Sequence, residues 1–145
     1  MFNKILVPLD GSEFADKALK YAIDVAKKFT SELLLVHVVQ TTTAFITGPE
    51  VLGPSLILDL RKQLEENGYR ILSIGEEIVK KADVKVITRL DYGNPPDKIL
   101  NMIKEENIDL VVVGHRGLGA AARFFLGSVS DKISQQSTCP VLIVK

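Results

Sequence analysis

The chain is poor in cysteine, in excess charge and in long apolar runs, and each shortage excludes a class of protein. Cys139 is the only cysteine among 145 residues, which rules out an intrachain disulfide or a cysteine-based zinc site. Lysine plus arginine equals aspartate plus glutamate, at 18 each, so no overall basic field attracts nucleic acid or an acidic membrane surface. We therefore expect no nucleic-acid partner, and a packing role for Cys139.

Apolar runs are short throughout. None approaches the roughly 18 residues of a membrane span, and the N-terminal residues have no signal-peptide pattern. These observations predict no membrane association and a cytoplasmic location. The length is typical of one domain with a normal core, so we expect a single domain over residues 1–145.

Strand and helix patterns alternate along the chain. Short apolar segments predict five strands, at 5–9, 33–39, 84–90, 110–113 and 141–144. Helical patterns lie between them, beginning at 12–13 and covering 56–81, 96–106 and 128–136. We expect Gly68 and Gly75 to weaken the second helix, a loop over 41–54, and a turn over 91–95. The alternation predicts an α/β fold with an open five-stranded parallel sheet, helices on both faces and the Rossmann-like strand order 3-2-1-4-5.

A glycine-rich loop follows the fourth predicted strand. Gly114 and Gly117 come directly after three valines, and Gly127 and Ser128 follow after a gap of nine residues. Glycines permit close approach of the backbone to a ligand, and a helix that starts at Ser128 points free N–H groups and the positive end of its dipole outward. Ser128 and Asp131 also match a capping box. The arrangement predicts a site for a nucleotide or another phosphorylated small molecule.

Two other glycine motifs fit less well. A P-loop needs a lysine after its last glycine, but Ala120 follows Gly119. Residues 117–122 match the dinucleotide fingerprint G-x-G-x-x-A, which requires an acidic residue about 20 positions later. Neutral residues 137–140 occupy that region instead. Neither motif is favoured.

The loop spacing resembles the universal stress protein family. The pattern G-x-x-G-x(9)-G-[ST], together with Val-Pro-Leu-Asp-Gly-Ser at residues 7–12, is similar to the ATP-binding branch, and the likeness covers the whole chain. It implies ATP, ADP or AMP as ligand. We expect no metal site from the protein alone, but the Ser128 hydroxyl has the chemistry to give one oxygen to a phosphate-bound Mg²⁺.

The resemblance also implies roles for nine residues. Asp10 contacts the ribose, Pro8 and Leu9 line the base, and Val38 presents backbone groups to the adenine. Gly114 lies under the ribose. The phosphate ligands are Gly117, Gly127, Ser128 and Val129.

Other polar residues near these positions have competing interpretations. We expect a second tier of phosphate contacts from His115, Arg116 and Ser130, with Arg123 weaker still. His115 stands where the family often has a small polar residue, and a solvated side chain is the alternative there. The alternative for Asp10 is to cap the helix that follows, together with Ser12. His37 lies in an apolar strand, which is typical of a hydrogen-bonded core histidine.

The last predicted strand bears on assembly. Residues 141–144 are all apolar, and an exposed edge strand is a template for pairing. The family resemblance implies that this strand pairs across a two-fold axis, so we expect a homodimer.

Three functions remain open at this point. The chain has no Walker lysine, no second carboxylate beside Asp10 and no clear general base, so we favour an ATP-binding stress-response regulatory protein with slow or partner-dependent hydrolysis at most. The second is a receiver-type phospho-acceptor domain, for which we expect the same strand order, with Asp91 and Lys145 as acceptor and lysine. A receiver also needs paired acids where Leu9 and Asp10 stand. The third is a dimeric adaptor of the same family that binds no nucleotide.

Overall fold

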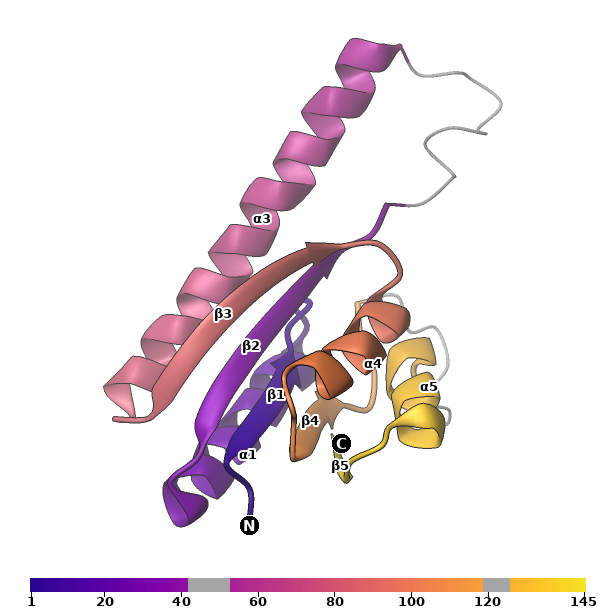
Figure 1. The fold of residues 1–145 in the computed structure, drawn as a ribbon. Helices are drawn as coiled ribbons and strands as arrows, with labels where there is room; N and C mark the ends of the chain where they lie inside the picture. Colours follow the sequence, from indigo (N-terminus) through magenta and orange to yellow (C-terminus); the bar gives the residue numbers. More distant parts are fainter. Residues whose placement is uncertain (42–52, 119–125) are drawn as a thin grey trace.

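A computed structural model describes residues 1–41, 53–118 and 126–145 (Figure 1). Most of the loop expected over 41–54, and Arg123, lie outside these described residues. The elements are β1 (Lys4–Pro8), α1 (Glu13–Phe29), β2 (Glu32–Val39), α3 (Pro54–Lys81), β3 (Lys85–Tyr92), α4 (Pro95–Glu105), β4 (Leu110–Gly114), α5 (Ser128–Gln136) and β5 (Val141–Val144). None of the helices within these ranges is both long and apolar enough to cross a membrane.

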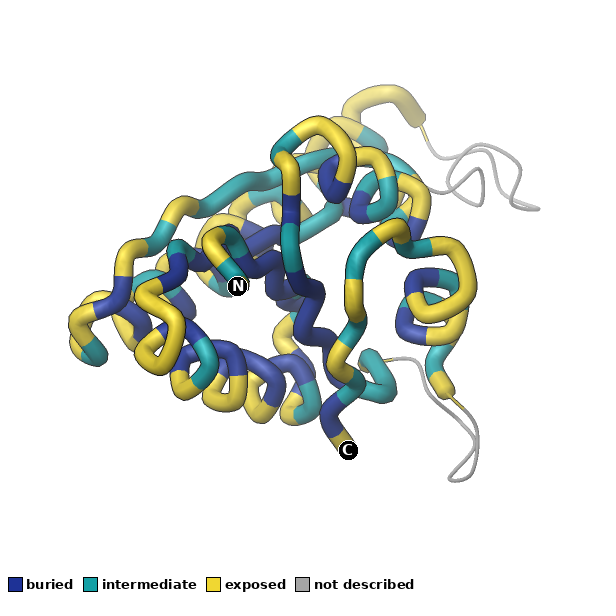
Figure 2. Tube along the Cα trace, turned by 60° about the horizontal axis from the view of Figure 1, so that its bottom comes forward, coloured by how far each residue is buried: buried dark blue, intermediate teal, exposed yellow. Residues whose placement is uncertain are grey.

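The five strands form one parallel sheet in the order β3-β2-β1-β4-β5. The predicted fold class and strand order are therefore confirmed. Because successive side chains of a strand point to opposite faces, Ile5 and Val7 pack in one core with α1 and α3, while Leu6 packs in a second core with α4 and α5. Figure 2 shows buried residues gathered along the strands and on the inner side of the helices.

The strand order also separates the chain from a receiver domain. Receiver domains have the flavodoxin-like order 2-1-3-4-5, so our expectation of a shared order was wrong. Asp91 was expected in a turn, but it lies within the edge strand β3, opposite Val38. Lys145 follows β5 at the opposite edge of the sheet. The two residues therefore belong to opposite edges, which does not fit a shared phospho-acceptor site.

Two buried glycines let α3 lie close to the sheet. A Cβ built on Gly75 would meet the Cδ1 atoms of Leu9 and Leu35, and one on Gly68 would meet the side chains of His37 and Leu90. The sequence pattern counted these glycines only as a helical weakness. The unfavourable helix propensity of the two glycines is offset by the close packing of α3 over β2 and β3. The N-terminal part of α3 extends beyond the sheet (Figure 1).

Gly114 occupies a tighter position than Gly75. A Cβ at Gly114 would lie 2.8 Å from both the carbonyl carbon and oxygen of Phe14, so the start of α1 would have to move. At Gly75 the nearest atoms are the ends of leucine side chains, which can shift. Gly114→Ala is expected to lower the free energy of unfolding by about 1–3 kcal/mol. Gly75→Ala should change it by less than about 1 kcal/mol, because gained helix propensity offsets the crowding.

Urea denaturation of the two variants beside the wild type measures this difference. The substitution is the same at both positions, and both glycines are buried. An equal loss of stability in the two variants would contradict the assignment of Gly114 to a backbone contact.

Candidate functional site

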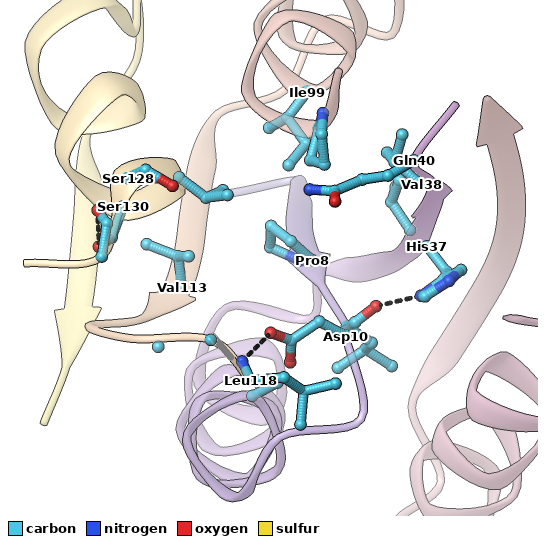
Figure 3. A pocket seen from close by; sticks show the side chains of 18 of the residues that line it. Pro8, Asp10, His37, Val38, Gln40, Ile99, Val113, Leu118, Ser128 and Ser130 are labelled. Carbon is cyan, nitrogen blue, oxygen red and sulfur yellow. Dashed lines mark hydrogen bonds between the residues drawn. The ribbon is translucent and has the colours of Figure 1, made fainter. Parts of the chain in front are cut away.

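A pocket of about 560 Å³ opens at the carboxyl ends of β1, β2 and β4 (Figure 3). Its walls come from the segments after β1 and β4, the end of β2, and parts of α3, α4 and α5. The volume is within the range of sites that enclose a small organic ligand. In open α/β sheets ligands bind where the chain reverses its order of strands, which here lies between β1 and β4.

The structure brings together, in the lining of this pocket, the nine residues to which the family resemblance assigned roles. They are Pro8, Leu9, Asp10, Val38, Gly114, Gly117, Gly127, Ser128 and Val129. Arg116 and Ser130 of the second tier also line it, whereas His115 does not.

Asp10 joins the segment after β1 to the loop after β4. Its Oδ1 accepts a hydrogen bond from the Ser12 N–H at 2.9 Å. Its Oδ2 accepts one from the Leu118 N–H at 3.2 Å (Figure 3). The cap of α1 is Ser12 itself, whose Oγ accepts from the Ala15 N–H at 3.2 Å. Asp10 therefore braces the turn before the helix and holds the second loop beside it.

Gly117 lies against this carboxylate. A Cβ built on Gly117 would overlap the Oδ2 atom of Asp10. The sequence pattern indicated that glycine is needed at position 117 so that a phosphate can approach the backbone. The structure shows a second reason for glycine there, which is the nearby carboxylate of Asp10. Only a residue without a side chain lets the loop pass Asp10 while Leu118 keeps its hydrogen bond.

The start of α5 forms the opposite wall. Gly127 is the N-cap of this helix and has no side-chain cap hydrogen bond, while Ser128 is its first helical residue and is exposed. The predicted capping box of Ser128 and Asp131 is therefore wrong, because the helix begins one residue earlier than a Ser128 cap requires. The first-turn N–H groups of the helix lie beside the pocket, where the helix dipole favours an anion.

Ser130 fixes α5 to the loop after β4. This buried side chain donates its hydroxyl proton toward the carbonyl oxygens of His115, at 2.9 Å, and Gly127, at 3.0 Å. The Gly127 N–H also donates to the His115 oxygen, at 2.7 Å. The serine hydroxyl is thus engaged within the protein, and it holds the helix start at the pocket.

The side chains of His115 and Arg116 lie in different places: His115 packs on Phe14, and Arg116 lines the pocket. The ring of His115 packs edge-to-face on Phe14, with centroids 4.5 Å apart and an 85° interplanar angle. Arg116 lines the pocket and is the only lysine or arginine among its described lining residues. Its buried Nε has no hydrogen-bond partner in the described part of the chain. Arg116 thus supplies the positive charge of this pocket.

His37 lies at the back of the pocket, on β2. Its Nδ1–H donates to the backbone oxygen of Leu9 at 2.7 Å (Figure 3). The predicted hydrogen bond of this histidine is therefore confirmed, but its side chain is half-buried and lines the pocket instead of lying in the core. Its other ring nitrogen faces Gly68 of α3.

Sequence reasoning missed the lining residues that come from α3 and α4. Among them are Leu64, Asn67, Pro95 and Ile99, and the segment directly after β2 adds Gln40. The helical residues carry no local signal, because the tertiary packing of each helix decides which side chains reach the pocket. A signal existed for Gln40, which follows β2 directly and stands two positions after Val38, in step with the alternation of the strand. Within the described ranges, no group of three or more histidine, cysteine or acidic side chains is arranged to hold a metal ion.

Comparison with known proteins identifies the family. The model of the universal stress protein family matches residues 1–145. The chain belongs to the universal stress protein family. The predicted resemblance is thereby confirmed.

Individual relatives agree with this membership. Universal stress protein YxiE of Bacillus subtilis is 40% identical over 148 residues, covering 100% of both chains. Among solved structures, hypothetical protein MJ0577 matches with a TM-score of 0.86 and 26% identity, over 100% of this chain and 96% of that one. A universal stress protein in complex with cAMP matches with a TM-score of 0.73 and 25% identity, over 99% of this chain and 97% of the other.

Proposed function

We propose that this universal stress protein binds an adenine nucleotide, ATP or its products ADP and AMP, as a stress-response regulatory protein of the ATP-binding branch. The observation that carries the proposal is the composition of the pocket. One end has backbone donors, a helix N-terminus and Arg116, the other end is apolar, and Asp10 lies between them. The donor-rich end suits the phosphates, the apolar end suits the base, and Asp10 between them suits the ribose that joins the two. The relative in complex with cAMP supports an adenine nucleotide in this fold.

The proposed roles follow this division. Pro8, Leu9 and Val38 enclose the base, and Asp10 accepts hydrogen bonds from the ribose hydroxyls. Gly114 lies beneath the ribose. The phosphates take the backbone N–H groups of Gly117, Gly127, Ser128 and Val129, with Arg116 adding charge. His115, whose ring packs on Phe14, supports the loop rather than a phosphate.

Magnesium enters this proposal only with the phosphates. The exposed hydroxyl of Ser128 has the chemistry to supply one oxygen to a phosphate-bound Mg²⁺. Asp10 is the only acidic side chain among the described lining residues, and both its oxygens accept backbone hydrogen bonds. A carboxylate engaged in this way is poorly suited to activate a water, so we propose slow or partner-dependent hydrolysis at most.

Mass spectrometry of the small molecules released from purified, heat-denatured protein tests the ligand class. We expect ATP, ADP or AMP in amounts approaching one per chain. Recovery of a different phosphorylated compound would replace the adenine assignment. A non-nucleotide adaptor of the same family would release nothing and would also fail to bind added ATP.

The wider setting of the protein is part of the same proposal. We propose that residues 1–145 form one nucleotide-binding domain that acts in the cytoplasm, without nucleic acid or membrane as partner. Equal numbers of acidic and basic residues support this, because the chain has no overall field to attract a polyanion.

A homodimer through β5 completes the proposal. β5 (Val141–Val144) lies at the edge of the sheet. The Val111 N–H donates to the Pro140 oxygen at 3.0 Å and the His115 N–H to the Val144 oxygen at 2.8 Å. Backbone groups of a strand alternate in direction, so Val141 and Ile143 turn theirs toward the free edge.

Ile143→Pro therefore removes an edge donor while the hydrogen bonds to β4 stay, as an edge strand tolerates. Light scattering is expected to show a wild-type dimer at micromolar concentration and a monomeric Ile143→Pro variant. Ile143→Val keeps the N–H and should remain dimeric. A wild-type monomer would refute the dimer, and a folded Ile143→Pro dimer would move the interface elsewhere.

A further inference from the structure

The pocket carries two carboxamide side chains, those of Gln40 and Asn67. Pro8, Val38 and Ile99 give one end of the pocket its apolar surface, and the Gln40 side chain lies at this end (Figure 3). A carboxamide offers both a hydrogen-bond donor and an acceptor. Polar groups of this kind, few in number within an apolar pocket, orient a ligand and give specificity.

Gln40 owes its position to β2. Val36 and Val38 belong to the core on the α4 and α5 side of the sheet. Gln40 is an exposed residue directly after β2, two positions beyond Val38, where the strand alternation would direct its side chain to the same side. In Figure 3 the Gln40 side chain projects into the pocket, with its carboxamide in the space between Pro8 and Ile99. The side chain is thus directed to the place where the proposed function puts the base.

We propose that the Gln40 carboxamide pairs with the polar edge of the base and makes the pocket selective for adenine. Adenine presents an amino donor at N6 beside an acceptor at N7, which matches the acceptor and donor of a glutamine. Hypoxanthine and guanine present acceptors at both O6 and N7, so the glutamine oxygen would be left without a donor. This inference rests on the proposed nucleotide site and goes beyond it by naming the side chain that selects the base.

Calorimetric titration with ATP and with inosine triphosphate tests the assignment, because the two nucleotides differ at position 6 of the base. Wild type is expected to bind ATP at least about tenfold more tightly. Gln40→Met keeps the length of the side chain but neither donates nor accepts as an amide does. It should weaken ATP binding and lower the preference for ATP by at least about fivefold. Gln63→Met is the matched control, since Gln63 is exposed on α3 and does not line the pocket.

The outcomes separate this inference from the function on which it rests. Backbone groups of Val38 are also proposed near the base, so a wild-type preference alone does not support Gln40. The loss of preference in Gln40→Met, with Gln63→Met unchanged, supports it. A folded Gln40→Met protein that keeps the wild-type preference overturns the role of Gln40, as does a wild type without preference, while nucleotide binding stands in both cases. A wild type that binds neither nucleotide overturns the proposed function and this inference together.

Discussion

Gly117→Val is expected to weaken ATP binding at least about tenfold, which corresponds to about 1.4 kcal/mol. A Cβ at this position would overlap Oδ2 of Asp10, so the carboxylate must move away from the place where it holds the Leu118 N–H. The branched side chain would also fill the wall proposed to receive a phosphate. The protein should stay folded, because Gly117 is only partly buried and the atom it would meet is the end of a side chain.

A double-mutant cycle shows whether the effect passes through Asp10. If the overlap with the carboxylate causes most of the loss, Gly117→Val should cost much less affinity in an Asp10→Ala background, since the atom it meets is gone. Calorimetric titration of the four proteins with ATP gives the coupling. Unchanged affinity in a folded Gly117→Val variant would contradict the placement of the phosphates at this loop.

Asp10→Ala is expected to lower ATP affinity by about tenfold or more, because a carboxylate that accepts hydrogen bonds from ribose hydroxyls makes charge-assisted contacts. The preference for ATP over an analogue lacking both ribose hydroxyls should also be lost. This second readout matters, since Asp10 already accepts hydrogen bonds from Ser12 and Leu118. Loosening of the loop alone would weaken both nucleotides equally.

Asp10→Asn provides the comparison. Asparagine can still accept the Ser12 N–H through one oxygen, but its amide nitrogen cannot accept the Leu118 N–H. The preference for the hydroxylated sugar should fall in this variant while the turn before α1 is kept. If both variants retain the wild-type preference, Asp10 is a brace for the two loops and does not contact the sugar.

The sheet could be predicted because its signals are local. Runs such as Val111–Val113 are apolar on both faces, as a covered parallel strand requires, and the turns between elements carry Gly, Pro, Asn or Ser. Boundaries were less secure: Asp91 and Tyr92 were expected in a turn, yet they extend β3 opposite Val38 and Val39. Pairing with a neighbouring strand decided that boundary, and a sequence pattern does not show which strand will be the neighbour.

The residues of the pocket also divide into those that a local motif predicts and those that only tertiary packing decides. Asp10 and the glycines were recognised because their types and spacing form a motif. The hydrogen bond between Asp10 and Leu118 joins residues 108 positions apart, and the packing of His115 on Phe14 also depends on the fold. The contributions of α3 and α4 depend on how each helix is rotated against the sheet. Such contacts follow from tertiary packing and have no counterpart in local periodicity.

The central claim, that the pocket between β1 and β4 binds an adenine nucleotide, is tested most directly by calorimetric titration of the wild-type protein with ATP. The account predicts saturable binding of one ATP per chain, with competition by AMP for the same site and at least about tenfold weaker binding by Gly117→Val. Absence of saturable binding of ATP, ADP and AMP to folded protein at millimolar concentration would contradict it.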